Sequence, residues 1–229
     1  MNIRSSLIRP IVGMIAIFLT VMIASITLAA EPTPVNPDAA ILQQRVVKLM
    51  GDAAHQNALK TAALDGFSKI FDCSTGKFEL TGPVSSYGPL NIDEAGHVTG
   101  GLLTERSRVT GCGNTLITNI LTGFKSGNNI SVFGMPGTTK ADPTLARDTV
   151  MYVFSAATLK IRDCKQVKII NTEFVEFFGE PNLKAKFQAN QGRPWREIWT
   201  IDVCGKERVP VPVEYVPDET GTAIVARHL

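Results

Sequence analysis

Apolar residues recur at helical spacing in three stretches of the chain. The three sets are Leu42, Val46, Leu49 and Met50; Leu59, Ala63, Gly66 and Ile70; and Val150, Phe154, Ala157 and Ile161. Steps of three and four residues place each set on one face of a helix, and such a face is most simply a core face. Asn36, Asp52 and Asp142 precede the three stretches as N-cap residues. The pattern therefore predicts three helices, beginning near residues 37, 53 and 143.

Between and after these stretches the pattern changes to that of β-strands. The predicted strands are residues 77–87, 105–111, 116–121 and 129–133 in the first half, and residues 167–178, 196–203, 209–215 and 222–227 in the second. Gly82 and Pro83 interrupt the first of them, so we expect this strand to be bent or to lie at an edge. Pro210 and Pro212 cannot donate to a neighbouring strand, so their strand is expected at an edge or paired on one side only.

Two short signatures occur twice. Residues 69–73 read K-I-F-D-C and residues 160–164 read K-I-R-D-C, at an offset of 91 residues. Residues 105–113 and 197–205 both begin with glutamate and end with C-G, at an offset of 92. The second and third helical stripes also lie 91 residues apart. We conclude that the chain carries a tandem duplication.

Each duplicated unit reads as a helix followed by about four strands, and local hairpin connections imply an antiparallel sheet with the helix on one face. We predict an α+β fold of two tandem homologous repeats, each with such a sheet and each stapled by a disulfide. The expected division is a signal peptide in residues 1–30, a first repeat in 31–133, a linker in 134–142 and a second repeat in 143–229. The sequence leaves open whether the repeats share one sheet.

This layout resembles that of cystatin-like folds. It also resembles the secreted β-lactamase inhibitory proteins, which likewise pair two α+β repeats with one disulfide each. The resemblance covers the order of the elements and the cysteine content. No family motif matches residue by residue, so the resemblance transfers no site.

The first thirty residues have the composition of a secretory signal peptide. Arg4 and Arg9 form a basic segment, residues 11–28 are almost wholly apolar, and Ala29 and Ala30 belong to a small-residue cleavage site. The apolar run is long, so an uncleaved membrane anchor is the alternative. We expect a periplasmic or secreted protein, with the bacterial periplasm favoured, and membrane contact only through this segment if it is uncleaved.

The balance of charges excludes one class of partner. The chain has 23 basic and 21 acidic residues, and the leader holds two of the basic ones, which leaves 21 of each. A neutral mature chain lacks the basic surface of a nucleic-acid-binding protein. We therefore expect no nucleic-acid partner.

Four cysteines in an exported chain indicate two disulfides, for which three connectivities exist. We favour Cys73–Cys112 and Cys164–Cys204, because a duplicated unit would carry its own bridge and the two separations, 39 and 40 residues, nearly agree. Each bridge would stabilise the fold by roughly 4 kcal/mol in the chain-entropy model. No two cysteines lie within five residues of each other, and no histidine is spaced to join them, so we expect no metal site.

Known catalytic motifs are missing from the sequence. There is no G-x-S-x-G elbow, H-E-x-x-H, Walker loop or dinucleotide fingerprint, so we expect no cofactor and favour a non-enzymatic protein. His97 lies beside Asp93 and Glu94, a set of side chains that can bind a metal or move protons. The alternative, a solvated polar loop, is the interpretation that we favour.

Two glutamates stand out among the polar residues. By strand parity Glu197 shares a face with Trp195 and Trp199, and Glu105 occupies the equivalent place in the first repeat. A carboxylate on an inner face must be paired, hydrogen-bonded or protonated. We favour two structural anchors; a pair of carboxylates acting on a ligand at the repeat interface is the alternative.

One loop of the second repeat has the composition of a contact surface. Residues 181–195 are basic and aromatic, with Lys184, Lys186, Phe187, Arg193 and Trp195, whereas their counterpart, residues 89–104, is expected to be an acidic, glycine-rich loop. Loops on a rigid scaffold often carry function, and tryptophan with arginine suits a contact surface. The alternative is that Trp195 covers the end of the sheet while the cations are solvated.

Together these observations predict an exported, non-enzymatic binding or interaction protein whose partner is a protein, a peptide or a cell-envelope component. The candidate binding residues are Lys184, Lys186, Phe187, Arg193, Trp195, Glu105 and Glu197. Two alternatives remain open. One is a hydrolase that uses Glu105 and Glu197, or an acid with His97. The other is a small-ligand carrier with a cavity between helix and sheet.

Overall fold

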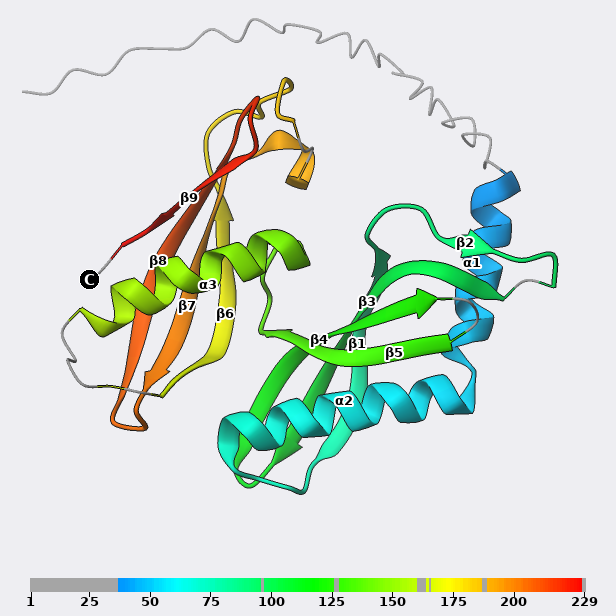
Figure 1. Cartoon of the computed structure of the whole chain (residues 1–229), viewed down its shortest axis with the longest axis horizontal. Coiled ribbons are helices and arrows are strands. Elements are labelled where there is room, and N and C mark those ends of the chain that lie inside the picture. The colour runs from blue at the N-terminus through cyan, green and yellow to red at the C-terminus, as the bar shows by residue number, and fades with distance from the viewer. Residues whose placement is uncertain are drawn as a thin grey trace, which may run out of the picture.

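Two antiparallel sheets, each crossed by a helix, form the described part of the protein (Figure 1). The computed structural model describes residues 37–95, 97–125, 128–159, 164, 166–186 and 189–227. The predicted signal peptide and most of the second K-I-x-D-C signature lie outside these residues. We call α1, α2 and the first sheet the first unit, and α3 and the second sheet the second unit.

The helices begin where the sequence predicts. They are α1 (Pro37–Met50), α2 (Ala53–Phe71) and α3 (Pro143–Thr158). The Asp52 carboxylate accepts from the backbone N–H of His55 at 2.8 Å. The Asp142 carboxylate accepts from the N–H groups of Thr144 and Leu145 at 2.8 and 2.9 Å. Both aspartates thus satisfy N–H groups that have no partner within their helix.

The first sheet has the order β1-β3-β4-β5, and β2 pairs with β3. Its strands are β1 (Lys77–Ser86), β2 (Asn91–Ile92), β3 (Val98–Gly111), β4 (Asn114–Lys125) and β5 (Asn128–Pro136). β1 is an edge strand, and its register shifts between Leu80 and Val84. Gly82 and Pro83 lie at this shift, so the expected irregular edge is confirmed.

The expected loop at residues 89–104 is wrong for most of its length. β2 and the first seven residues of β3 lie in it, and β3 pairs with β4 from Gly100 onward. Gly100 and Gly101 obscured the strand, because glycine has a low strand propensity and interrupts the alternating pattern. The extra length of β3 carries Thr104 and its neighbours to the junction between the units.

The second sheet has the order β6-β7-β8-β9. Its strands are β6 (Val167–Phe177), β7 (Trp195–Val203), β8 (Glu207–Pro217) and β9 (Thr222–Ala226). β8 is a central strand, but β9 pairs with it only from Val213 to Pro217. Pro210 and Pro212 lie before that stretch and pair only with β7 in the ladder, although Arg227 N, just after β9, donates to the Pro212 oxygen at 3.0 Å. Pairing on one side is confirmed for Pro210, and an edge position is wrong.

Each unit buries its own core between helix and sheet. In the first, α2 contributes Leu59 and Phe67, and the sheet contributes Val109, Leu116 and Ile120. The larger second core contains two tryptophans, Tyr215 and four aliphatic side chains of the sheet, packed against alanines and Val153 of α3. β7 alternates buried and half-buried residues along its whole length, as its sequence predicts.

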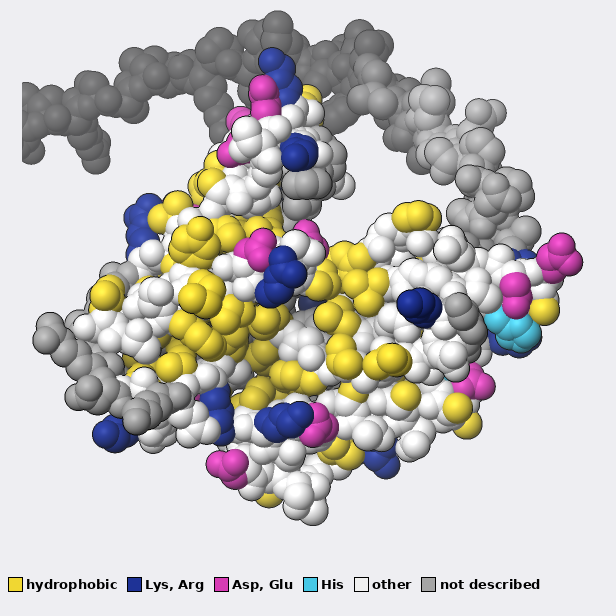
Figure 2. Space-filling model, in the orientation of Figure 1, with side chains coloured by type: hydrophobic (Ala, Val, Ile, Leu, Met, Phe, Trp, Pro, Cys, Tyr) yellow, Lys and Arg dark blue, Asp and Glu magenta, His cyan; other side chains and the backbone are white. Residues whose placement is uncertain are grey.

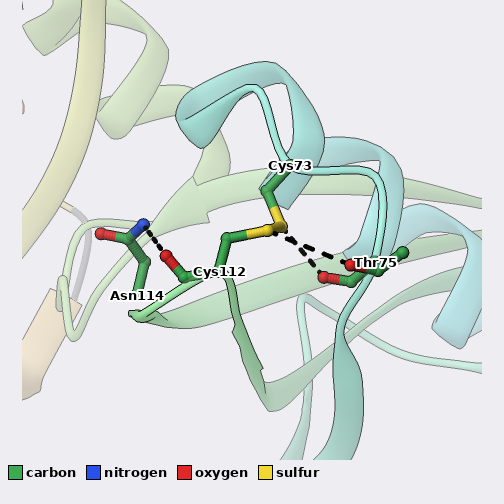
Figure 3. The surroundings of a disulfide bond; sticks show 4 residues. All are labelled: Cys73, Thr75, Cys112 and Asn114. Carbon is green, nitrogen blue, oxygen red and sulfur yellow. Dashed lines mark hydrogen bonds between the residues drawn. A yellow bond between two sulfur atoms is a disulfide. The ribbon is translucent and has the colours of Figure 1, made fainter.

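The two disulfides have the expected connectivity. Cys73 bonds to Cys112 and Cys164 bonds to Cys204. Figure 3 shows the first bridge tying the end of α2 to the β3–β4 turn, with the Thr75 backbone oxygen 3.0 Å from Cys73 Sγ. Such bridges are typical of an oxidising compartment outside the cytoplasm. None of the described helices is long and apolar enough to cross a membrane.

The segment between the two sheets is bonded to both of them. Gly137 N donates to Ile117 O of β4, and Thr138 N donates to Thr172 O of β6. Gly137 has a φ of +89°, and a Cβ there would lie 1.9 Å from the Thr172 oxygen, so only glycine fits this approach. Lys168 Nζ also donates to the Lys69 carbonyl oxygen at 3.0 Å, which joins β6 to the end of α2.

Candidate functional site

Glu197 is fully buried and accepts four hydrogen bonds. Its Oε1 accepts from Lys140 N at 2.7 Å and Trp195 Nε1 at 2.9 Å. Its Oε2 accepts from Thr139 Oγ1 at 2.8 Å and Trp199 Nε1 at 2.9 Å. Because β7 alternates, both indoles lie on the same face as the carboxylate, two residues on either side of it. The carboxylate therefore holds the segment between the units against the second core.

Glu105 is also fully buried, but its partners are of another kind. Its Oε1 lies 2.6 Å from His55 Nε2 of α2. Its Oε2 accepts from Thr122 Oγ1 at 3.0 Å, and Thr122 lies 2.9 Å from Ser131 Oγ. His55 Nδ1 is buried without a hydrogen-bond partner. The imidazole and the hydroxyls can each donate or accept, so this network has more than one way of placing its protons.

The two glutamates occupy corresponding positions in their sheets. Glu105 pairs across the ladder with Ile120, and Glu197 pairs with Val213. Each lies in the interior of its own unit, and they share no hydrogen-bond partner. Neither lines the cavities described below. Their bonds are those of buried anchors, and the geometry does not bring the two carboxylates together around a ligand.

The structure separates the residues of the expected contact loop. Trp195 is buried, stacks on Tyr215 with 4.6 Å between ring centroids and bonds to Glu197. It is therefore not a surface residue, and the expected contact surface lacks its tryptophan. Lys184, Lys186 and Arg193 are exposed, and the Arg193 guanidinium lies 4.9 Å from the centre of the Phe177 ring. Phe187 lies outside the described residues.

His97 has one acidic neighbour in the described structure. Its Nδ1 lies 3.2 Å from Asp93 Oδ2, and both side chains are solvent-exposed. Within the described ranges, no three histidine, cysteine or acidic side chains are grouped closely enough to hold a metal ion. The loop has the geometry of a local turn, in which the Asp93 carboxylate also accepts from His97 N.

A polar space with residues from both units lies between them. Its floor is the outer face of the first sheet, and its other wall is the segment between the units with the start of α3. The cavity volume is about 430 Å³. The residues that line this cleft are Ser85, Tyr87, Thr104, Arg106, Asn119, Leu121, Phe133, Gly134, Met135, Thr139, Lys140, Ala141, Pro143 and Ala146. We call this space the inter-unit cleft.

A fixed arginine lies on the floor of the inter-unit cleft. Arg106 Nε donates to Asn119 Oδ1 at 3.2 Å. Asn119 in turn donates to the backbone oxygens of Met135 and Gly137 at 2.8 and 3.1 Å. Gly82 on the neighbouring strand leaves room for the arginine stem, because a Cβ there would lie 2.7 Å from the Arg106 Cβ. The guanidinium is thus oriented through the same segment that joins the units.

Two hydroxyl groups lie beside this arginine. Burial raises the pKa of the Tyr87 phenol, while Thr104 and Arg106 act in the opposite direction, so the phenol remains a hydrogen-bond donor at neutral pH. Thr104 Oγ1 is buried, and its contact with the Tyr87 phenol falls outside standard hydrogen-bond geometry. A buried hydroxyl that is weakly bonded at the wall of a cavity can still bind a ligand.

The sequence did not identify the cleft. Strand parity predicts that Arg106 lies on the face opposite Glu105. The sequence does not predict that the second unit covers this face, because that depends on how the units pack. No sequence motif or periodicity marks Tyr87 or Lys140 as a cleft residue.

No protein-family model, no curated protein and no solved structure matches the chain. The observations therefore define a class by fold alone: an α+β protein with two antiparallel sheets and two disulfides, and with a polar cleft between its units.

Proposed function

We propose that the protein is an exported, non-enzymatic binding protein that holds a ligand in the inter-unit cleft. The observation that carries this proposal is a cleft of about 430 Å³ that is lined by polar groups of the first sheet and of the segment between the units, and that the start of α3 closes on one side. A volume in this range suits a small molecule or a small group of a peptide or envelope component. The groups that would meet it are held by a rigid scaffold rather than by mobile loops.

The proposal includes the origin and location of the protein. Both units contain a helix followed by four strands in the same sheet order, to which the first unit adds α1 and β2. This shared order, the matching disulfide separations and the glutamates at corresponding ladder positions support a tandem duplication. The two disulfides and the composition of the first thirty residues support export to the periplasm or the medium.

A hydrolytic function is less well supported. It needs Glu105 and Glu197, or an acid with His97, to meet a substrate at one place. Each glutamate is instead enclosed by its own partners, and His97 is 66% exposed beside a single aspartate. The two geometries favour anchoring and solvation over acid–base chemistry.

A fragment screen by two-dimensional NMR tests the binding function. The full-length exported protein is titrated with a library of small, soluble compounds. We expect the compounds that bind to shift the amide signals of residues that line the inter-unit cleft. Ser85→Trp, which places a large side chain at the cleft wall, is expected to abolish these shifts.

Ser86→Trp is the matched control, because Ser86 is an exposed neighbour on β1 that does not line the cleft. It should bind as the wild type does. Shifts spread over the whole surface, or binding that Ser85→Trp leaves intact, would contradict the proposed site.

A further inference from the structure

We propose that the ligand of the inter-unit cleft is a small organic acid, whose carboxylate is received by Arg106 and whose apolar body lies against the opposite wall. This inference rests on the proposed binding function and specifies its ligand. It follows from the charge of the lining, the orientation of one guanidinium and the distribution of apolar side chains, which are taken in turn.

The lining of the cleft includes two cationic residues, Arg106 and Lys140, and no acidic one. The Lys140 ammonium lies 5.4 Å from the centre of the Phe174 ring, which is not part of the lining, so Arg106 is the cation left to meet a ligand. Arg106 makes no ion pair among the described residues, and its one hydrogen bond to a side chain uses Nε. The terminal guanidinium nitrogens are left for another acceptor. A guanidinium presents paired N–H donors that match the two oxygens of a carboxylate.

Arg196, on the outer face of the second sheet, shows how an arginine of this protein is otherwise neutralised. It donates to Glu214 at 2.9 Å and to Glu176 at 2.7 Å. These bonds, the one to Glu214 first, raise the pKa of its guanidinium. Arg106 is half-buried like Arg196, yet it has no such partner among the described residues. A ligand carboxylate would supply the missing acceptor.

The nearest acid does not fill this role. Asp142 lies close enough to Tyr87 to influence the phenol, but it lines the neighbouring cavity rather than the inter-unit cleft. Its carboxylate caps α3 through two backbone N–H groups. The Asp142 carboxylate therefore serves as the N-cap of α3, and Tyr87 lines both cavities.

Neutral donors surround the position that a carboxylate would take. The hydroxyl of Thr104 is buried and lies beside that of Tyr87 without standard hydrogen-bond geometry, and the Tyr87 phenol stays protonated at neutral pH. Ser85 pairs with Thr104 across the ladder, so its side chain is on the same face. Hydroxyl groups add hydrogen bonds to an anion without adding charge.

The remaining lining is apolar and argues for an organic body rather than a bare oxyanion. The apolar side chains are Leu121, Met135, Ala141, Pro143 and Ala146; Phe133 also lines the cleft, but its ring packs against Gly66 of α2. An inorganic phosphate would leave this wall in contact with water, whereas an alkyl or aromatic group would cover it. The volume of about 430 Å³ accommodates an acid of roughly ten heavy atoms with room for ordered water.

Matched acids and amides provide the test. The full-length protein is titrated calorimetrically and by NMR with octanoate and 3-phenylpropionate, with the corresponding neutral amides, and with inorganic phosphate. We expect at least one acid to bind at the cleft at least ~10-fold more tightly than its amide and than phosphate, because charge-assisted hydrogen bonds exceed neutral ones.

Arg106→Gln should weaken binding of the acid by ~10-fold or more and remove the preference for acid over amide. Arg108→Gln is the matched control: Arg108 lies two residues away on the same face of β3, is exposed and does not line the cleft. This control should bind as the wild type does. Thermal unfolding of both variants shows whether either has lost its fold, and Arg106→Lys provides a more conservative second variant, expected to retain part of the affinity.

The outcomes separate the two proposals. Amides that bind as tightly as acids, or acid binding unchanged in Arg106→Gln, would overturn the carboxylate inference while leaving a binding cleft. Phosphate binding as tight as that of the acids would replace the organic acid with a simple oxyanion. If no compound of either series shifts the cleft signals and the fragment screen also finds none there, the proposed function fails with it.

Discussion

The buried carboxylates of the two units have the same place in their sheets but different surroundings. Glu197 is met by two indole N–H groups, a backbone N–H and a hydroxyl. That hydroxyl, of Thr139, itself accepts from Ala141 N, so its hydrogen points to the carboxylate. All four partners donate, and Glu197 must accept at both oxygens. Glu105 is met by an imidazole and a hydroxyl, which can each donate or accept.

A buried carboxylate can thus be stabilised by partners that can only donate, or by partners that can both donate and accept. The partners of Glu197 admit a single arrangement of hydrogens, and they include the segment that joins the units. The partners of Glu105 can exchange roles along the chain from His55 to Ser131. Substitutions that swap an acceptor for a donor should therefore have unequal effects in the two units.

Glu197→Gln should have the largest effect. The amide nitrogen would face two donors, so at least two buried groups would lose their partners. We expect the free energy of unfolding to fall by about 3 kcal/mol or more. Urea denaturation followed by tryptophan fluorescence measures it, with the exposed Glu207→Gln as control. A loss below about 1 kcal/mol would show that the surroundings of Glu197 can rearrange, which removes the contrast.

Gly66→Ala should come next. A Cβ at Gly66 would lie 1.9 Å from Phe133 Cδ2, so the ring must move. The second unit has Ala157 and Ala226 at the corresponding helix and ladder positions. We expect a loss of about 1–3 kcal/mol from overpacking.

A double-mutant cycle with Phe133→Ala sharpens this prediction. The two substitutions together should destabilise the protein by less than the sum of their separate effects, since the smaller side chain makes room for the new methyl group. Additive effects would mean that the first unit accommodates the Cβ in another way. Ala157→Gly, which removes a methyl group from the second core, should cost about 1 kcal/mol through helix propensity.

Glu105→Gln should have a smaller effect than its counterpart. The amide can donate to Thr122 Oγ1 or to the imidazole, each of which can accept, so the network can be satisfied again. We expect a loss of about 1 kcal/mol, measured as for Glu197→Gln. A loss equal to that of Glu197→Gln would show that the partners of Glu105 do not exchange roles.

Substitutions on the outer helix faces should have the smallest effect. Met151 and Leu159 of α3 are 70% and 67% exposed, and hydrophobic side chains gather on this side of the molecule in Figure 2. The residue of α2 at the offset of 91 from Met151 is Lys60, which is also exposed. Met151→Lys should change the free energy of unfolding by less than about 0.5 kcal/mol. Lys60→Met is the reciprocal variant, and a loss above about 1 kcal/mol in Met151→Lys would reveal packing that the folded chain depends on.

Hydrophobic spacing and turn residues predicted much of this fold. Helix starts, the irregular β1, the disulfide connectivity and the inward direction of Glu105 and Glu197 all followed from local patterns. The partners of the glutamates did not. His55 lies 50 residues from Glu105, and its role depends on the helix packing over the strand. Trp195 was assigned to a contact surface because its residue type suits one, whereas parity with Glu197 already placed it inside.

The candidate cleft was harder to foresee for a physical reason. Its floor is the outer face of β3 and β4, which in an isolated sheet would be an ordinary solvated surface. Arg106 becomes a site only when the second unit covers that face. Periodicity reports which side of a strand a residue is on, and it carries no information about what another unit places there.

The bonds of Lys140 and Thr139 to Glu197 also determine where the protein can be divided. Ala141 belongs to the second core, and the segment from Gly137 onward runs beside β6. A chain that began at Pro143, the first residue of α3, would leave Glu197 without two of its four donors and β6 with β7 as its single neighbour. The second unit therefore needs the residues just before α3 to complete its core and to cover the edge of β6. A fragment that folds on its own has to begin before Gly137. The start of the second repeat that the sequence predicts, residue 143, therefore differs from the residue at which the folded chain could be cut without loss of contacts.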